Sequence, residues 1–148
     1  MNRTIGFKER RYIEELLILT KSTAIDCVID EKFDRVIYLI KQVDMGLAIG
    51  KKGENIKKMQ KVLGKKIEMV EFGERIDDFI INIFRPVEIS AIKKDETGSS
   101  VDVVIKKRSD LGIAIGKKGA NVEKARILLK RLYHIDMGDI RWEGAESG

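Results

Sequence analysis

The sequence LAIGKKG at residues 47–53 returns as IAIGKKG at residues 113–119, 66 residues further along the chain, with six of the seven positions identical. The likeness continues at the same offset outside these residues, for example from Asn55 to Asn121. Self-similarity at a fixed period indicates one structural unit used twice. We therefore expect two domains of the same fold.

Hydrophobic patterns around the two motifs predict the same series of elements twice. The first copy predicts a helix through Ile13, Leu16, Leu17 and Thr20, strands at 25–29 and 36–40, a helix at 56–63 and a strand at 66–70. The second predicts a helix at 76–84 ended by Pro86, strands at 87–93 and 101–105, a helix at 122–129 and a strand at 135–140. A short helix precedes each glycine motif. These limits predict domains at residues 1–72 and 73–143, joined without a flexible linker, and a disordered tail at 144–148.

The repeated glycine motif has the chemistry of an anion site. A Gly-Lys-Lys-Gly turn between two helices lets the backbone approach a ligand, while the next helix presents unpaired N–H groups and a positive dipole end. The simpler interpretation, a tight corner with ordinary solvated lysines, weakens because the arrangement occurs twice. The motif is not a nucleotide P-loop, because Lys52 and Lys118 stand where a hydroxyl residue is required. Its glycine spacing also differs from the dinucleotide-binding fingerprint.

Positive charge gathers around both motifs. Residues 35–70 carry a net charge of +6 and residues 101–136 carry +5, although the whole chain of 148 residues has only +5, so the remainder carries −6. Such concentration is the pattern expected for binding a polyanion.

Composition limits the classes of function. The chain has one cysteine, Cys27, and one histidine, His134, which excludes an internal disulfide and a zinc finger. Cys27 lies in an apolar strand pattern and is expected in the core. We find no catalytic dyad, metal cluster or nucleotide loop, and so expect no enzyme activity, no cofactor and no metal. With no apolar run near the ~18 residues of a membrane span and no signal peptide after Met1, we expect a cytoplasmic monomer away from membranes.

The motif also carries a family resemblance. IGKKGENI at 49–56 and IGKKGANV at 115–122 resemble the I-G-x-x-G-x-x-I signature of K-homology (KH) domains. The extra helix and strand before the core are similar to the type II arrangement. The resemblance implies an α+β fold, with two type II KH domains in tandem, each a three-stranded mixed sheet with helices packed on one face. Such a pair looks like the RNA-binding core of the NusA family of transcription termination and antitermination factors, in its short archaeal form.

The resemblance implies that each glycine loop clamps single-stranded RNA. The implied RNA-binding residues are Ile49, Gly50, Lys51, Lys52, Gly53, Asn55, Ile56 and Lys57, and in the second copy Ile115, Gly116, Lys117, Lys118, Gly119, Asn121, Val122 and Lys124. Ala48 and Ala114 would join the groove floor, with Met69 and Ile135 as walls. Two domains on one strand would gain affinity because the second engagement is intramolecular.

Two alternatives remain open at this point. The protein could bind ribosomal RNA in ribosome assembly or maturation, or it could be a KH-fold protein-interaction module. The chain also leaves no room for the polymerase-binding N-terminal domain or the S1 module of bacterial NusA. A contact with RNA polymerase is therefore left open as well.

Overall fold

The computed structural model describes residues 5–146 and divides the chain into two compact units, with the division between Gly73 and Glu74. The sequence patterns place the boundary one residue earlier, after residue 72. Among residues 5–146, no helix combines the length and the hydropathy that crossing a membrane requires.

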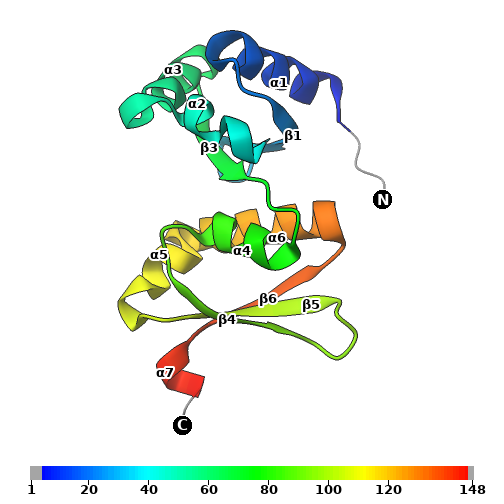
Figure 1. Cartoon of the computed structure of the whole chain (residues 1–148), viewed down its shortest axis with the longest axis vertical. Coiled ribbons are helices and arrows are strands. Elements are labelled where there is room, and N and C mark those ends of the chain that lie inside the picture. The colour runs from blue at the N-terminus through cyan, green and yellow to red at the C-terminus, as the bar shows by residue number, and fades with distance from the viewer. Residues whose placement is uncertain (1–4, 147–148) are drawn as a thin grey trace. The chain divides into compact units, whose positions relative to one another are not determined.

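The first unit is a three-stranded sheet with helices on one side (Figure 1). Strand β1 pairs antiparallel with the central strand β2, and β2 pairs parallel with β3. Its elements are α1 (Phe7–Thr20), β1 (Ala24–Asp30), β2 (Arg35–Ile40), α2 (Met45–Ile49), α3 (Glu54–Leu63) and β3 (Lys66–Glu71).

The second unit repeats this order and this topology. Its sheet again has an antiparallel pair, β4 with β5, and a parallel pair, β5 with β6. Its elements are α4 (Ile76–Phe84), β4 (Ile89–Lys94), β5 (Ser100–Ile105), α5 (Leu111–Ile115), α6 (Ala120–Tyr133), β6 (Asp136–Trp142) and α7 (Glu143–Glu146). Two three-stranded mixed sheets with helices confirm the predicted α+β class.

One segment differs from the expected disordered tail. Residues 143–146 form the single helical turn α7, directly after β6. Residues 147–148 lie outside the described part of the chain.

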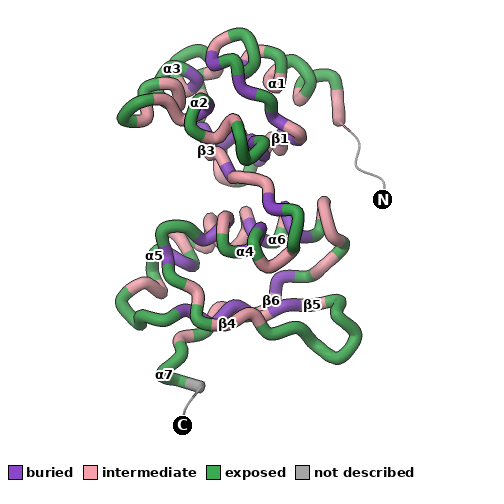
Figure 2. The backbone as a smooth tube through the Cα atoms, viewed as in Figure 1, coloured by how far each residue is buried: buried purple, intermediate pink, exposed green. Residues whose placement is uncertain are grey.

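The central strand of each sheet is its most buried strand. Buried residues are purple in Figure 2. All six residues of β2 are buried, and the helix-facing Val36, Tyr38 and Ile40 form a core with Leu16 of α1 and Met59 of α3. Cys27 joins this core at 1% exposure, as expected. The helices and the inner face of the sheet thus hold the first unit together through apolar burial.

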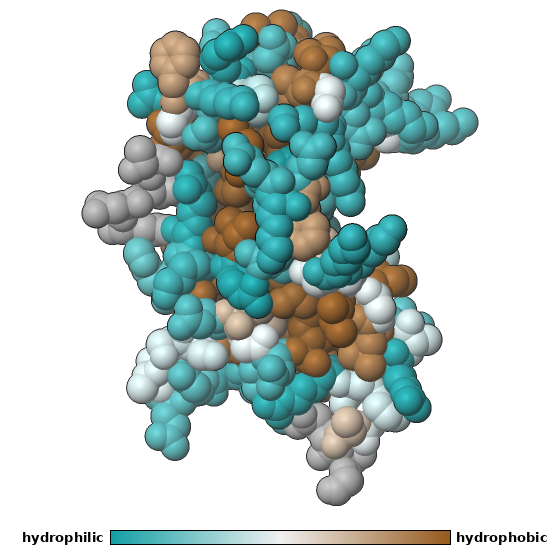
Figure 3. All heavy atoms as spheres, turned by 180° about the vertical axis from the view of Figure 1, so that it is seen from behind, coloured by the Kyte–Doolittle hydropathy of each residue, from teal (hydrophilic) through white to brown (hydrophobic). Residues whose placement is uncertain are grey.

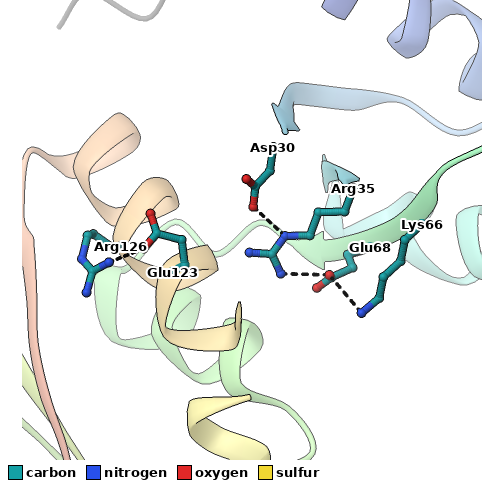
Figure 4. Close-up of polar contacts among 6 residues, drawn as sticks. All are labelled: Asp30, Arg35, Lys66, Glu68, Glu123 and Arg126. Atoms are coloured by element: carbon teal, nitrogen blue, oxygen red, sulfur yellow. Dashed lines mark hydrogen bonds and ion pairs between the residues drawn. The ribbon is translucent and has the colours of Figure 1, made fainter. Parts of the chain in front are cut away.

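The other face of the first sheet carries buried charge that strand alternation does not predict. Asp26 and Asp30 alternate with apolar residues in β1, yet they are 0% and 7% exposed. Arg35 is 2% exposed, and its Nε donates to Oδ2 of Asp30 at 2.8 Å while its Nη1 donates to Oε2 of Glu68 at 3.0 Å (Figure 4). Because β2 is buried on both faces, the neighbouring residues of β1 are covered too, and Arg35 supplies the countercharge that a buried carboxylate needs.

Candidate nucleic-acid interface

The first glycine of each loop is required by the backbone. Gly50 ends α2 with φ 75° and ψ 167°, and Gly116 ends α5 with φ 82° and ψ 162°. A Cβ on Gly50 would lie 2.9 Å from the backbone nitrogen of Asn55, and one on Gly116 would lie 2.5 Å from that of Asn121. Only glycine fits both the dihedral angles and this close approach.

The next residues turn the chain into the following helix. Lys52 and Gly53 both adopt left-handed conformations, with φ of 56° and 74°. Lys118 and Gly119 do the same, with φ of 57° and 79°. The two consecutive left-handed residues place both lysines of each loop at the surface, at the start of α3 or α6.

An asparagine side chain holds each turn in place. Nδ2 of Asn55 donates to the carbonyl oxygen of Leu47 at 2.7 Å, and Nδ2 of Asn121 donates to that of Ala114 at 2.9 Å. Each bond ties the first turn of the helix after the loop to the short helix before it. The two amides predicted to contact RNA therefore have a bracing role in the free protein.

The structure brings most of the expected lysines to the surface beside the loops. Lys51, Lys52, Lys57, Lys117 and Lys118 are exposed, whereas Lys124 is half-buried. When the molecule is seen from behind, hydrophilic side chains project from the part of the first unit that holds α2 and α3 (Figure 3). Positive charge therefore surrounds the turn, as the sequence predicted.

The expected aliphatic floor is only partly at the surface. Ala48 and Ala114 are 0% exposed, so they are core residues and cannot touch a ligand in this conformation. Ile49, Ile56 and Val122 are half-buried, and Ile56 packs against the core of its unit. Ile115 is 39% exposed and remains available.

Two apolar residues that the sequence interpretation missed lie at the surface beside the loops. Leu47 is 53% exposed and Ile113 is 57% exposed, at the same position of the two short helices. Their repetition at the same position of the two short helices makes them candidates for a contact surface. Both residues begin the repeated seven-residue motif, and this shared position was the signal in the sequence that could have identified them.

The two expected walls differ in their placement. Met69 lies in β3 and packs against the core of the first unit. Ile135 precedes β6 rather than belonging to it, and its backbone nitrogen donates to the carbonyl of Leu129 at 3.3 Å. Ile135 therefore belongs to the turn after α6.

A basic depression continues from the first loop along α3. It is open, encloses about 420 Å³, and is lined largely by the aliphatic parts of its side chains. Its lining residues are Lys51, Lys52, Glu54, Lys57, Lys58 and Lys61. We call this feature the α3 depression.

Comparison with known proteins identifies the kind of domain. Residues 9–93 match the family model of the KH domain, and residues 76–140 match that of the NusA-like second KH domain. The crystal structure of APE1850 superposes with a TM-score of 0.80 at 38% identity, covering 93% of this chain and 100% of that one.

Two relatives carry the same printed description, probable transcription termination protein NusA. The protein of Halococcus morrhuae is 31% identical over 92% of this chain and 96% of its own length. That of Methanocaldococcus jannaschii is 37% identical over 72% of this chain, and the match spans 58% of its own length.

Proposed function

The chain belongs to the KH family and, within it, to the NusA-like proteins, and on this basis we propose that it binds single-stranded RNA through both GKKG loops and acts in transcription termination or antitermination. The observation that carries the proposal is the pair of equivalent, asparagine-braced turns, each with two exposed lysines. The RNA-binding residues expected from the sequence remain part of this proposal.

Each loop would hold the RNA backbone by two means. The exposed ammonium groups of its lysines attract phosphate. The unpaired N–H groups in the first turn of the following helix carry the partial positive charge of that helix end and would attract phosphate as well. The brace keeps this arrangement in the absence of ligand, so little ordering is needed on binding.

The bases would meet aliphatic side chains rather than aromatic rings. The exposed apolar residues beside the loops are Leu47 at the first and Ile113 and Ile115 at the second. Aromatic residues make up only 6% of the chain, and none flanks either loop. This composition favours a KH groove over a base-stacking platform, which uses aromatic side chains.

The loops would act on one strand together. A KH groove clamps about four nucleotides, so two of them engage about eight. Once one domain has bound, the second engagement is intramolecular, and the combined affinity exceeds that of either domain. The proposal assigns no catalytic step to the protein.

The test replaces the loop lysines by aspartate. Aspartate tolerates a left-handed backbone better than most residues, so Lys52→Asp and Lys118→Asp should keep the turn, and Lys51→Asp and Lys117→Asp complete the two pairs. Fluorescence anisotropy with a labelled RNA of about twelve nucleotides should show binding that weakens with salt in the wild type and is lost in the fourfold variant. Circular dichroism and a thermal melt check the fold.

Two results would reject the proposal. Wild-type affinity in a correctly folded fourfold variant would show that the loops do not bind RNA. Absence of any RNA binding by the wild type would favour the protein-interaction alternative. Preferential binding of a ribosomal RNA fragment over unstructured strands would instead favour the ribosomal alternative.

A further inference from the structure

The two domains share their loops but differ in the helix that follows. Lys57 and Lys61 line the α3 depression, and 66 residues later α6 carries Glu123 and Ile127 at the same positions. Of the five lysines that line the depression, only Lys57 and Lys61 have no lysine counterpart in the second domain.

The lysines of the α3 depression are largely without countercharge. Among the residues that the structure describes, no acidic group pairs with the ammonium groups of Lys51, Lys52, Lys57 or Lys61. Lys58 lies 3.4 Å from Glu54, but both side chains are more than half exposed, so the attraction is weak. The depression thus presents a net positive charge that the protein itself does not neutralise.

At the positions of Lys57 and Lys61 the second domain has the acidic Glu123 and the apolar Ile127, so the corresponding surface carries less positive charge. Glu123 accepts a hydrogen bond from Arg126 on the same helix (Figure 4). Further along α6, Nζ of Lys130 lies 3.0 Å from Asp136. Arg126 and Lys130 of α6 thus each have an acidic neighbour, although the pair of Lys130 and Asp136 is more than half exposed and its attraction is weak.

We infer that the RNA backbone runs past the first GKKG loop into the α3 depression, which makes the first domain the main phosphate anchor of the protein. This inference rests on the proposed function and extends it to residues outside the loop. Lys57 and Lys61 stand one helical turn apart, about 6 Å along the axis, and continue the line of charge that Lys51 and Lys52 begin.

The chemistry of the depression favours a sugar-phosphate chain over a base-specific contact. Lysine ammonium groups are flexible point charges, which neutralise phosphate without imposing the fixed geometry that arginine does. The aliphatic stems can cover the sugars of the same strand. The anchor should therefore add affinity regardless of sequence, and leave discrimination between bases to the grooves.

The test exchanges the residues that distinguish the two helices. The variant Lys57→Glu/Lys61→Ile gives α3 the side chains of α6, and Glu123→Lys/Ile127→Lys does the reverse. A control variant, Lys93→Glu/Lys94→Ile on the exposed part of β4, makes the same change of net charge at residues that belong to neither helix. All three are measured with an RNA of about twelve nucleotides and one of about five, which fills one groove and little more.

The α3 variant should bind the longer RNA about tenfold more weakly, and its salt slope should fall by about 1.4, since two lysine–phosphate contacts are lost at ~0.7 each. Its affinity for the short RNA should change much less. The reverse variant should bind the longer RNA more tightly with a steeper slope. The control should stay close to the wild type.

The outcomes separate this inference from the proposed function. If the α3 variant matches the control while the fourfold loop variant still loses binding, the depression is not used and the loop assignment stands. If the wild type binds no RNA, both fail. Poly-glutamate serves as a third probe. If the α3 variant loses the binding of poly-glutamate and keeps that of RNA, the depression serves an acidic protein instead.

Discussion

Replacing Gly116 by alanine should destabilise the second domain far more than the same change at Gly119. At Gly116 the backbone lies in a region used almost only by glycine, which costs an alanine about 1–3 kcal/mol. The new Cβ would also lie 2.5 Å from the backbone nitrogen of Asn121, so the start of α6 must shift. We expect a total loss of about 3 kcal/mol or more.

Gly119 is the matched control three residues away. Its φ of 79° and ψ of 17° are left-handed, a conformation that costs alanine about 1–2 kcal/mol. A Cβ there meets nothing within 4 Å. The reduced entropy of the unfolded chain favours alanine equally at both sites, so it cancels in the comparison. The difference between the two variants should be about 2 kcal/mol.

Urea denaturation followed by tryptophan fluorescence measures this difference. Trp142 is the only tryptophan and ends β6 of the second unit, so its signal reports on the domain that carries both glycines. The denaturation midpoint should fall much further for Gly116→Ala than for Gly119→Ala, at equal m-values. Equal losses in the two variants, or a negligible loss at Gly116, would refute the argument from close approach.

Three further changes test other parts of the structure, each by urea denaturation. Asn121→Ala removes the brace to the last turn of α5 and should cost about 1 kcal/mol; an unchanged midpoint would mean that the bond is not formed in solution. Arg35→Met leaves the buried carboxylate of Asp30 without this countercharge and should lower the free energy of unfolding by about 3–5 kcal/mol. Its control, Lys65→Met, breaks the exposed pair with Asp34 and should cost at most about 1 kcal/mol. Similar losses in the two variants would contradict the burial of the Arg35–Asp30 pair. Burial raises the pKa of Tyr38 well above its ordinary value of 10.0. The neutral Tyr38 side chain therefore makes its full contribution to the free energy of unfolding below pH 10, and this contribution is lost as the pH rises further. The stability advantage of the wild type over Tyr38→Phe should therefore be constant below about pH 10 and shrink as the pH rises above it, and an advantage that stays constant above pH 10 would argue against the raised pKa.

The sequence was informative where a pattern had a clear physical period. The offset of 66 residues predicted two copies, and the runs of apolar residues predicted the helices and strands of an α+β fold, because burial on one face imposes those periods. The glycine positions were also readable, since few other residues reach the φ values found at Gly50 and Gly116.

Features that depend on tertiary packing could not be read in this way. The burial of Asp26 and Asp30 follows from a central strand covered on both faces, whereas alternation assumes one wet face. In the five-residue helix α2, spacing does not distinguish Leu47, which is exposed, from Ala48, which is buried. The bracing role of Asn55 depends on the path of the turn, and sequence spacing alone does not provide that path.

The left-handed lysines of the two loops have a consequence for how this protein can evolve. Lys52 and Lys118 occupy a conformation that glycine or asparagine would adopt at lower cost, by about 1–2 kcal/mol at each site. A screen that selects for heat resistance alone should therefore replace them. Selection for the RNA binding proposed above should keep them, and under that proposal these two positions exchange stability for activity.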